Sequence, residues 1–362
     1  MRNAAPPLAW VQELETALPG NIGVGCEASN ATVSGDDVYH ANSGDTLVLP
    51  PMDPYGPKTR WIDIFARGVS GCEWSLASSA DYVILSQYSG ATGGNNGTDT
   101  RIYVSIDWTK VPAAPNTTTV TIAVTSDCNG NAWGPYPAPT VQVTVINPSI
   151  PSTFTGFVES DGHISIEAEH TSRNTSVDGV GYVILSSYGR TKSGVTMLPV
   201  LAPSQPAGTG PVLEYDIFTF TNTSSANITL FLSPSLNQAG AARPLKYGIA
   251  IDAEPIRVVQ FVGNYTGSNM PPYWAGAVSD AVWGGVASGN TTTTMHDLSR
   301  VGMHTLRIWT VEPGVVVQKI VIDLGGVRYS YLGPPESFLM GRDTVGVYDG
   351  TNFAGVVLKD VI

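Results

Sequence analysis

The stretch from Gly302 to Asp323 constrains the fold of this chain more than any other. Leu306 and Ile308 alternate with polar or mixed neighbours, which predicts a strand with one apolar face. Glu312-Pro313-Gly314 interrupts the pattern, since proline presets the first central position of a type II turn and glycine accepts the positive φ of the second. Val315–Ile322 is then a β-branched run that we expect to be buried on both faces. Such a pair of strands closes the core of a β-sandwich.

The composition indicates a globular chain of about two domains, as expected for 362 residues. Hydrophobic residues make up 42% of the chain, enough for real cores, whereas charged residues make up only 13%. The 39 glycines and 26 prolines suit short strands joined by many turns. The net charge of −12 disfavours nucleic acid and anionic membranes as partners. No apolar run reaches the roughly 18 residues of a membrane span.

The order of strand and turn signals predicts an all-β chain of two sandwiches. Residues 1–20 contain a short amphipathic helix, Leu8–Leu18, which we interpret as the remnant of an upstream helical domain. Strands separated by Gly, Pro and Asn predict an immunoglobulin-like β-sandwich over 21–148 and a jelly-roll β-sandwich over 153–333. A stiff, polar connection, Asn147–Ser152, separates the two domains. We assign no fold to the tail, 338–362.

Several features are typical of an extracellular glycoprotein. Asn-X-Ser/Thr sequons occur at eight positions, which are Asn30, Asn96, Asn116, Asn174, Asn222, Asn227, Asn264 and Asn290. The three cysteines, Cys26, Cys72 and Cys128, allow one disulfide and one free thiol, but their pairing cannot be read from the sequence. No apolar signal-peptide core follows Met1, so we expect the native gene product to begin further upstream.

Long segments of the chain resemble the C-terminal part of glycoside hydrolase family 115, the xylan α-1,2-glucuronidases, and fungal members in particular. These segments are DPYGPKTRWIDIF (Asp53–Phe65), SIDW (Ser105–Trp108), FVESDGHISIEAEH (Phe157–His170), GRTKSGVTMLPV (Gly189–Val200), LEYDIF (Leu213–Phe218), HTLRIWTVEPGVVVQKIVID (His304–Asp323) and YLGPPES (Tyr331–Ser337). Together they cover both predicted sandwiches.

The resemblance implies a non-catalytic accessory role. In that family the site that cleaves glucuronic acid belongs to an upstream barrel, and this chain has no β/α alternation. We therefore assign no catalytic residue and expect no activity of the isolated chain. The resemblance implies support of a catalytic domain, homodimerisation and contact with glucuronoxylan or a similar polysaccharide. Two alternatives are a free-standing lectin-like or adhesion module and an enzyme complete in itself.

Two carboxylates, Glu167 and Glu169, lie two positions apart on an expected strand and therefore on the same face. They could be a hydrolytic pair, ligands of a cation, or ordinary strand carboxylates that are solvated or paired with Lys or Arg. The strands that contain Glu167 and Asp323 resemble those of family 6 and family 35 carbohydrate-binding modules, which have a galactose-binding-like jelly roll. That resemblance implies a structural calcium held by Glu167, Glu169 and Asp323, with His170 as a departure from the pattern. We expect no required cofactor.

The segment MPPYWAGAVSDAVWGG combines aromatic rings with a carboxylate. Sugars stack their C–H faces on aromatic rings while their hydroxyls need polar partners. The segment therefore predicts a carbohydrate site made of Tyr273, Trp274, Asp280 and Trp283. The alternative is that these tryptophans only fill the edge of the sandwich.

Overall fold

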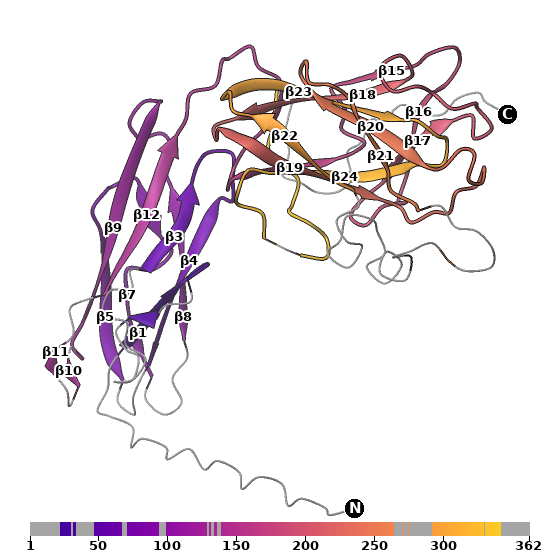
Figure 1. The fold of residues 1–362 in the computed structure, drawn as a ribbon. Helices are drawn as coiled ribbons and strands as arrows, with labels where there is room; N and C mark the ends of the chain where they lie inside the picture. The colour runs from indigo at the N-terminus through magenta and orange to yellow at the C-terminus, as the bar shows by residue number, and fades with distance from the viewer. Residues whose placement is uncertain are drawn as a thin grey trace, which may run out of the picture. The chain divides into compact units, whose positions relative to one another are not determined.

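The computed structural model describes residues 22–29, 32–33, 47–66, 71–93, 99–128, 130–131, 134–135, 139–263, 270, 274, 292–328 and 330–341. These residues form strands β1–β25 in two compact units, Met1–Ser149 (unit 1) and Ile150–Ile362 (unit 2) (Figure 1). The all-β prediction is thus confirmed for the described residues, and the division between the units falls inside the predicted connection. The helix expected in 1–20 lies outside the described residues. In the part of the chain that is described, no helix is long and apolar enough to cross a membrane.

The described residues of unit 1 form two five-stranded sheets and a two-stranded one, β10-β11. The orders of the larger sheets are β2-β1-β4-β8-β6 and β3-β12-β9-β5-β7. The strands are β1 (Ile22–Cys26), β2 (Thr32–Val33), β3 (Leu47–Met52), β4 (Thr59–Ala66), β5 (Cys72–Ser78), β6 (Val83–Leu85), β7 (Ser89–Thr92), β8 (Thr100–Ile106), β9 (Asn116–Ser126), β10 (Gly130–Asn131), β11 (Gly134–Pro135) and β12 (Thr140–Asn147).

Alternation along these strands builds the core of unit 1, as the sequence predicts. On β4, Ile62 and Ile64 point inward and are fully buried. Trp61, the residue before Ile62, lies on the other face and is only half-buried. The guanidinium of Arg101 covers its ring at 4.0 Å from the centroid, while the same guanidinium pairs with Asp63. The Arg101–Asp63 pair therefore shields the indole of Trp61 on the outer face of this sheet.

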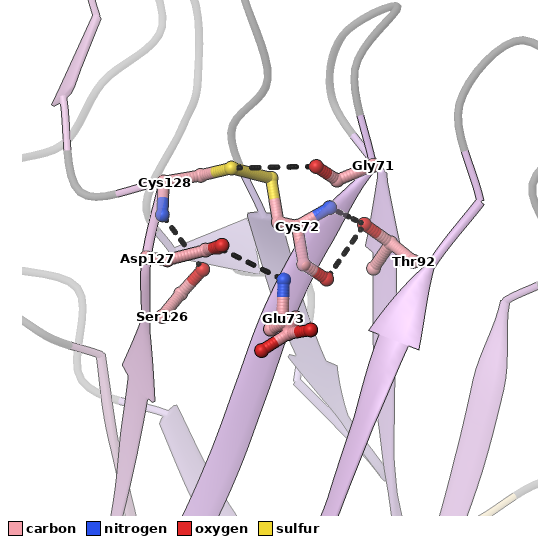
Figure 2. The surroundings of a disulfide bond; sticks show 7 residues. All are labelled: Gly71, Cys72, Glu73, Thr92, Ser126, Asp127 and Cys128. Carbon is pink, nitrogen blue, oxygen red and sulfur yellow. Dashed lines mark hydrogen bonds between the residues drawn. A yellow bond between two sulfur atoms is a disulfide. The ribbon is translucent and has the colours of Figure 1, made fainter.

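A disulfide joins Cys72, at the start of β5, to Cys128, just past β9 (Figure 2). The two strands are neighbours in one sheet, so the bridge links elements that the sheet already brings together. The Asp127 carboxylate accepts a hydrogen bond from the Glu73 amide at 2.8 Å beside the bridge. Cys26 is a free, buried thiol. The structure thereby selects one of the three pairings that the sequence left open.

In the part of unit 2 that the structure describes, the strands form a seven-stranded and a six-stranded sheet. The first has the order β21-β20-β23-β18-β13-β25, with β15 paired to β18, and the second the order β16-β17-β24-β19-β22, with β14 paired to β24. The strands are β13 (Gly156–Val158), β14 (His163–Glu167), β15 (Arg173–Thr175), β16 (Gly181–Leu185), β17 (Gly194–Leu198), β18 (Val212–Thr219), β19 (Thr223–Leu232), β20 (Lys246–Ile251), β21 (Arg257–Gln260), β22 (Thr293–Leu298), β23 (Gly302–Thr310), β24 (Val316–Asp323) and β25 (Leu339–Met340).

The stretch Gly302–Asp323 links the two sheets of unit 2. β23 lies in the seven-stranded sheet and β24 in the six-stranded one. Gly314 in the intervening turn has φ of +94°, the left-handed conformation that the sequence predicts for it. Every residue of β24 from Val316 to Ile322 is buried. The half-buried strand and the doubly buried strand therefore face each other across one core.

Unit 2 extends further along the chain after β24 than the sequence predicts. Ser337 donates its amide to the Ser165 carbonyl at 2.8 Å, beside β14. Leu339 and Met340, expected to lie in an unassigned tail, form β25 and pair with β13. The segment thus extends from the six-stranded sheet to the other one, because exposed strand edges accept further backbone hydrogen bonds. Residues 342–362 lie outside the described residues.

Candidate functional site

Unit 2 has a pocket of about 280 Å³ beside β18 and β23. β20 and β23 are antiparallel, so the residue that follows β20 lies next to the first residues of β23. β18 pairs with the other edge of β23. Three separate segments thereby bring polar side chains to one place. The lining residues are Thr153, Phe154, Thr155, Asp216, Asp252, Met303, His304 and Thr305.

Thr305 connects the two carboxylates of the pocket. It lies directly opposite Asp216 in the β18–β23 register. Its hydroxyl donates to Asp216 Oδ1 at 2.9 Å, and its backbone amide donates to Asp252 Oδ1 at 2.8 Å. One residue of β23 therefore fixes both acids.

His304 holds the second carboxylate from another side. Its Nδ1 lies 2.7 Å from Asp252 Oδ2, and its Nε2 lies 2.6 Å from the Arg300 carbonyl oxygen. Both partners are acceptors, so the ring satisfies both only when each nitrogen carries a hydrogen. The Arg300 guanidinium adds a contact to Asp252 Oδ2 at 3.2 Å. Asp252 is thus surrounded by donors.

Asp216 is likewise held by donors, as part of a network of ion pairs between arginines and acids on neighbouring strands. Arg173 on β15 donates to both oxygens of Asp216, at 2.5 and 2.8 Å, and to Glu214 at 2.8 Å. Arg307 on β23 donates to the other oxygen of Glu214 at 3.1 Å. Bidentate guanidinium–carboxylate pairs are the geometrically most specific ion pairs. Arg173, which does not line the pocket, therefore fixes the orientation of the Asp216 carboxylate.

The surroundings of the two acids lower the pKa of both. Burial raises the pKa of Asp216, but the hydrogen bonds from Arg173 and Thr305 outweigh it and the pKa lies below its usual range. Burial also raises the pKa of Asp252, while the Thr305 amide and His304 lower it further than burial raises it. A glycosidase pair needs one carboxyl with a raised pKa to act as the acid. Here both acids are ionised acceptors.

The three carboxylates predicted to hold calcium do not converge, which corrects the prediction. β14 ends at Glu167, so Glu169 lies in a turn rather than two positions along a strand. In the β14–β24 register Glu167 lies opposite Lys319, while Asp323 lies opposite His163. The two positions lie four apart on β24, which is about 13 Å at roughly 3.3 Å per residue.

Each carboxylate of that predicted site contacts a group of the protein. Lys319 Nζ lies 3.2 Å from Glu167 Oε1. Asp323 Oδ1 accepts a hydrogen bond from the Gly325 amide at 2.8 Å. Glu169 Oε1 lies 3.9 Å from the Nε2 atom of His170. Among the described residues, three potential metal ligands gather only at Cys72, Asp127 and Cys128. Figure 2 shows that the two sulfurs there form the disulfide, which leaves no thiolate to bind a metal.

The family assignment rests on unit 2. Residues 156–336, half of the chain, match the model of the glycosyl hydrolase family 115 C-terminal domain. The chain belongs to this family. No curated protein sequence matches it.

Solved structures similar to this family 115 chain include BtGH115A, a GH115 4-O-methyl-α-glucuronidase with specificity for decorated arabinogalactans. That likeness has a TM-score of 0.30 at 12% identity and covers 44% of this chain and 17% of BtGH115A. For the Podospora anserina GH26-CBM35 β-(1,4)-mannanase the TM-score is 0.27 at 12% identity, and the likeness covers 45% of this chain and 28% of the mannanase. The Arthrobacter globiformis T6 isomalto-dextranase in complex with panose has a TM-score of 0.27 at 9% identity, and the likeness covers 76% of this chain and 36% of the dextranase. The chain therefore spans well under half the length of each of these proteins.

The carbohydrate site predicted from sequence lies mostly outside the described residues. Tyr273, Asp280 and Trp283 are not described. Trp274 is half-buried and packs against the core of unit 2. For Trp274 this contact fits the alternative reading, in which the ring fills the edge of the sandwich. The proposed role of these four residues in sugar binding stays a prediction.

The pocket residues were missed as a set by the sequence reasoning. Asp216 and His304 lie in two of the segments that resemble family 115, LEYDIF and HTLRIW, while Asp252 follows the strand Lys246–Ile251. A local signal exists for Asp216, since a carboxylate alternates with apolar residues there and must face outward. No local signal links it to Asp252, because strand pairing decides that neighbourhood.

Proposed function

We propose that this chain is a non-catalytic accessory portion of a glycoside hydrolase that acts on a glucuronic-acid-bearing polysaccharide. The family match over 156–336 carries this proposal. The pocket supports it, because its two acids have lowered pKa values and neither is poised as a general acid. In this role the chain would support a catalytic domain, contribute to homodimer formation and contact glucuronoxylan or a related polymer. We propose that this enzyme is an extracellular xylan α-1,2-glucuronidase of fungal origin.

The finer fold assignments are part of the same proposal. We assign unit 1 an immunoglobulin-like arrangement, because two antiparallel-rich sheets of five strands enclose one core. We assign unit 2 a galactose-binding-like jelly roll, because its two sheets enclose a second core and the chain passes repeatedly from one sheet to the other. Both architectures serve as scaffolds on which loops and sheet faces bind ligands.

Two measurements test the proposal with the full chain. Affinity electrophoresis in gels containing glucuronoxylan, arabinogalactan or mannan should retard the chain in at least the first polymer. Incubation with glucuronoxylan should release no 4-O-methylglucuronic acid. Uronic acid release that a single carboxylate substitution abolishes would refute the accessory role. Sedimentation over a range of concentrations tests the homodimer, and a monomer at high concentration would exclude it.

A further inference from the structure

We propose that Asn227 carries an N-linked oligosaccharide and that the first sugar of this glycan covers the exposed side chain of Met295. This inference rests on the extracellular location in the proposed function, because Asn-X-Ser/Thr sequons are glycosylated in secreted proteins. Asn227-Ile228-Thr229 is one of the eight sequons of the chain. The sequence alone does not rank these sequons, whereas the structure shows how the described ones present their amides.

The first step is the position of Asn227 on β19. Ala226, Ile228 and Leu230 are fully buried in the core of unit 2. Because successive side chains of a strand point to opposite faces, Asn227 points away from that core, and its side chain is exposed. No hydrogen bond joins this side chain to another of the described residues. Its amide is therefore open on the outer face of the sheet.

The second step is the pair of strands that flank Asn227. In the register of the six-stranded sheet, Asn227 lies directly opposite Met295 of β22 and Asp323 of β24. Asp323 is engaged with its own loop, since its Oδ1 accepts hydrogen bonds from the amides of Gly325 and Val327 at 2.8 and 3.3 Å. Met295 is 52% exposed, although its thioether side chain is apolar. A sugar on Asn227 therefore has an uncovered apolar side chain beside it.

The third step is the reach of the first sugar. Directly opposite residues of antiparallel strands have Cβ atoms about 4.5–5.5 Å apart. The first sugar is bonded to the Asn227 amide itself, so its ring lies within contact distance of the Met295 side chain. Packing of the C–H face of the ring on the thioether removes apolar surface from water. Later sugars lie further out, so we assign the contact to the first sugar alone.

The other described sequons lack this combination. Asn174 Nδ2 donates to the Tyr182 carbonyl at 3.5 Å, and Asn116 Oδ1 accepts the Thr118 hydroxyl at 2.8 Å, so both amides contact the protein. Asn222 is exposed, but it precedes β19 and its register with β22. Among the described sequons, the one at residue 227 thus combines an open amide with an exposed apolar neighbour on the next strand.

The chemistry of the modification supplies a conservative variant. Asn227 Nδ2 forms a bond to the anomeric carbon of a lipid-linked oligosaccharide, the bond from that carbon to the lipid pyrophosphate breaks, and the amide gives up one proton. The Thr229 hydroxyl completes the sequon, and in the folded chain it pairs with the Thr293 hydroxyl at 2.8 Å. Thr229→Val therefore abolishes the sequon while it keeps Asn227 and a β-branched residue in the strand.

The first test is the occupancy of Asn227. The full chain is expressed behind a secretory leader in yeast, purified from cells and medium together, and mapped by peptide mass spectrometry after enzymatic glycan release in heavy-oxygen water. We expect Asn227 to become a labelled aspartate in the chain of native sequence and to stay asparagine in Thr229→Val. An unlabelled Asn227 in the native sequence would overturn the inference. Retardation by glucuronoxylan tests the proposed function separately, so that function would survive this outcome.

The second test is the oxidation of Met295 by hydrogen peroxide in the folded chain. The glycosylated chain should be oxidised at Met295 at least about twofold more slowly than Thr229→Val, because oxidation follows exposure of the thioether. Trimming with endoglycosidase H leaves the first sugar in place and should keep this protection. Release of the whole glycan from the folded chain should remove it, so the comparison does not depend on the variant alone.

Two controls accompany the oxidation test. Met303 is 51% exposed on β23 of the other sheet and should be oxidised at the same rate in every form. Asn222→Gln removes the neighbouring sequon and should leave Met295 protected. Equal oxidation of Met295 with and without the glycan would overturn the contact between the first sugar and this side chain.

Discussion

Lys319 and Glu167 form a buried ion pair across β14 and β24, with Nζ 3.2 Å from Oε1 and both side chains less than 5% exposed. The ammonium also donates to the carbonyls of Leu332 and Pro334, at 3.2 and 3.0 Å. Glu167 accepts the Thr191 hydroxyl at 2.6 Å. The pair therefore ties three parts of unit 2 together: the two strands, the loop before β17 and the segment that follows β24.

We expect Lys319→Met to destabilise unit 2 by about 3–5 kcal/mol, because it leaves the Glu167 carboxylate buried without its cation. Urea unfolding followed by tryptophan fluorescence measures the change. The double variant Glu167→Leu with Lys319→Met is the control and should recover much of the loss, since no buried charge is left. A single variant as stable as the unmodified chain would contradict this account.

We expect calcium to leave the stability of unit 2 unchanged through Glu167, Glu169 and Asp323. Lys319 occupies the neighbourhood of Glu167, and the register separates that residue from Asp323. A ligand that binds only the folded state raises the melting temperature with its concentration. Calorimetry with millimolar calcium and then with excess EDTA should therefore give the same transition for unit 2. A rise with calcium that Glu167→Gln abolishes would restore the metal site.

A buried histidine should make unit 2 sensitive to mild acid. His296 is 1% exposed, with Nδ1 2.7 Å from Glu254 Oε2 and Nε2 2.8 Å from the Thr294 hydroxyl. Burial lowers the pKa of His296, and the neighbouring Glu254 only partly opposes this. Below a pH of about 6.5 the unfolded chain then binds more protons at this position than the folded one, so stability falls as the pH falls.

The measurement for His296 is the free energy of unfolding between pH 7 and pH 5, which one such group changes by at most about 1.4 kcal/mol per pH unit. His296→Gln keeps hydrogen-bonding groups without a titrating ring and should flatten the slope in this range. The lowered pKa values of Asp216 and Asp252 affect stability in a different pH range, because the stabilisation from these two groups is lost only below a pH of about 4. An identical slope in the His296 variant would refute the assignment.

The disulfide should stabilise unit 1 and leave unit 2 unaffected. Cys72 and Cys128 are 56 residues apart, and closing a loop of that size in the unfolded chain corresponds to about 4 kcal/mol in the chain-entropy model. Replacing both cysteines with alanine should lower the midpoint of the unit 1 transition in differential scanning calorimetry. Reduction with dithiothreitol should have the same effect. A fall in the unit 2 transition would mean that the two units do not unfold separately.

Cys26 should be inert to thiol reagents in the folded chain. The side chain is buried, and burial raises the pKa of its thiol to about 11, so little thiolate exists at neutral pH. Ellman's reagent should detect no thiol under native conditions and one thiol in guanidinium chloride. Cys26→Ala is the control that removes the denatured signal. Rapid labelling of the native chain would show that β1 opens readily or that Cys26 is not buried.

The local pattern of the sequence predicted several of the strands and their inward faces. Ile62 and Ile64 are buried on one side of β4 and Trp61 is not, as the alternation predicts. The Glu312-Pro313-Gly314 turn and the doubly buried β24 also follow from residue types alone. Backbone geometry explains this success, because side-chain period and turn dihedrals depend on near neighbours in the chain.

Only the tertiary structure decided which side chains meet. The register of β14 on β24 places Lys319 rather than Asp323 beside Glu167, and a shift of a few residues would have produced a different partner. The pairing of Cys72 with Cys128, and the position of Thr305 between Asp216 and Asp252, likewise depend on which strands become neighbours. Strand order and register are fixed by packing of the whole core. For this reason residue types determined the inward faces and the turn of these strands, while the pocket and the ion pairs came from the fold.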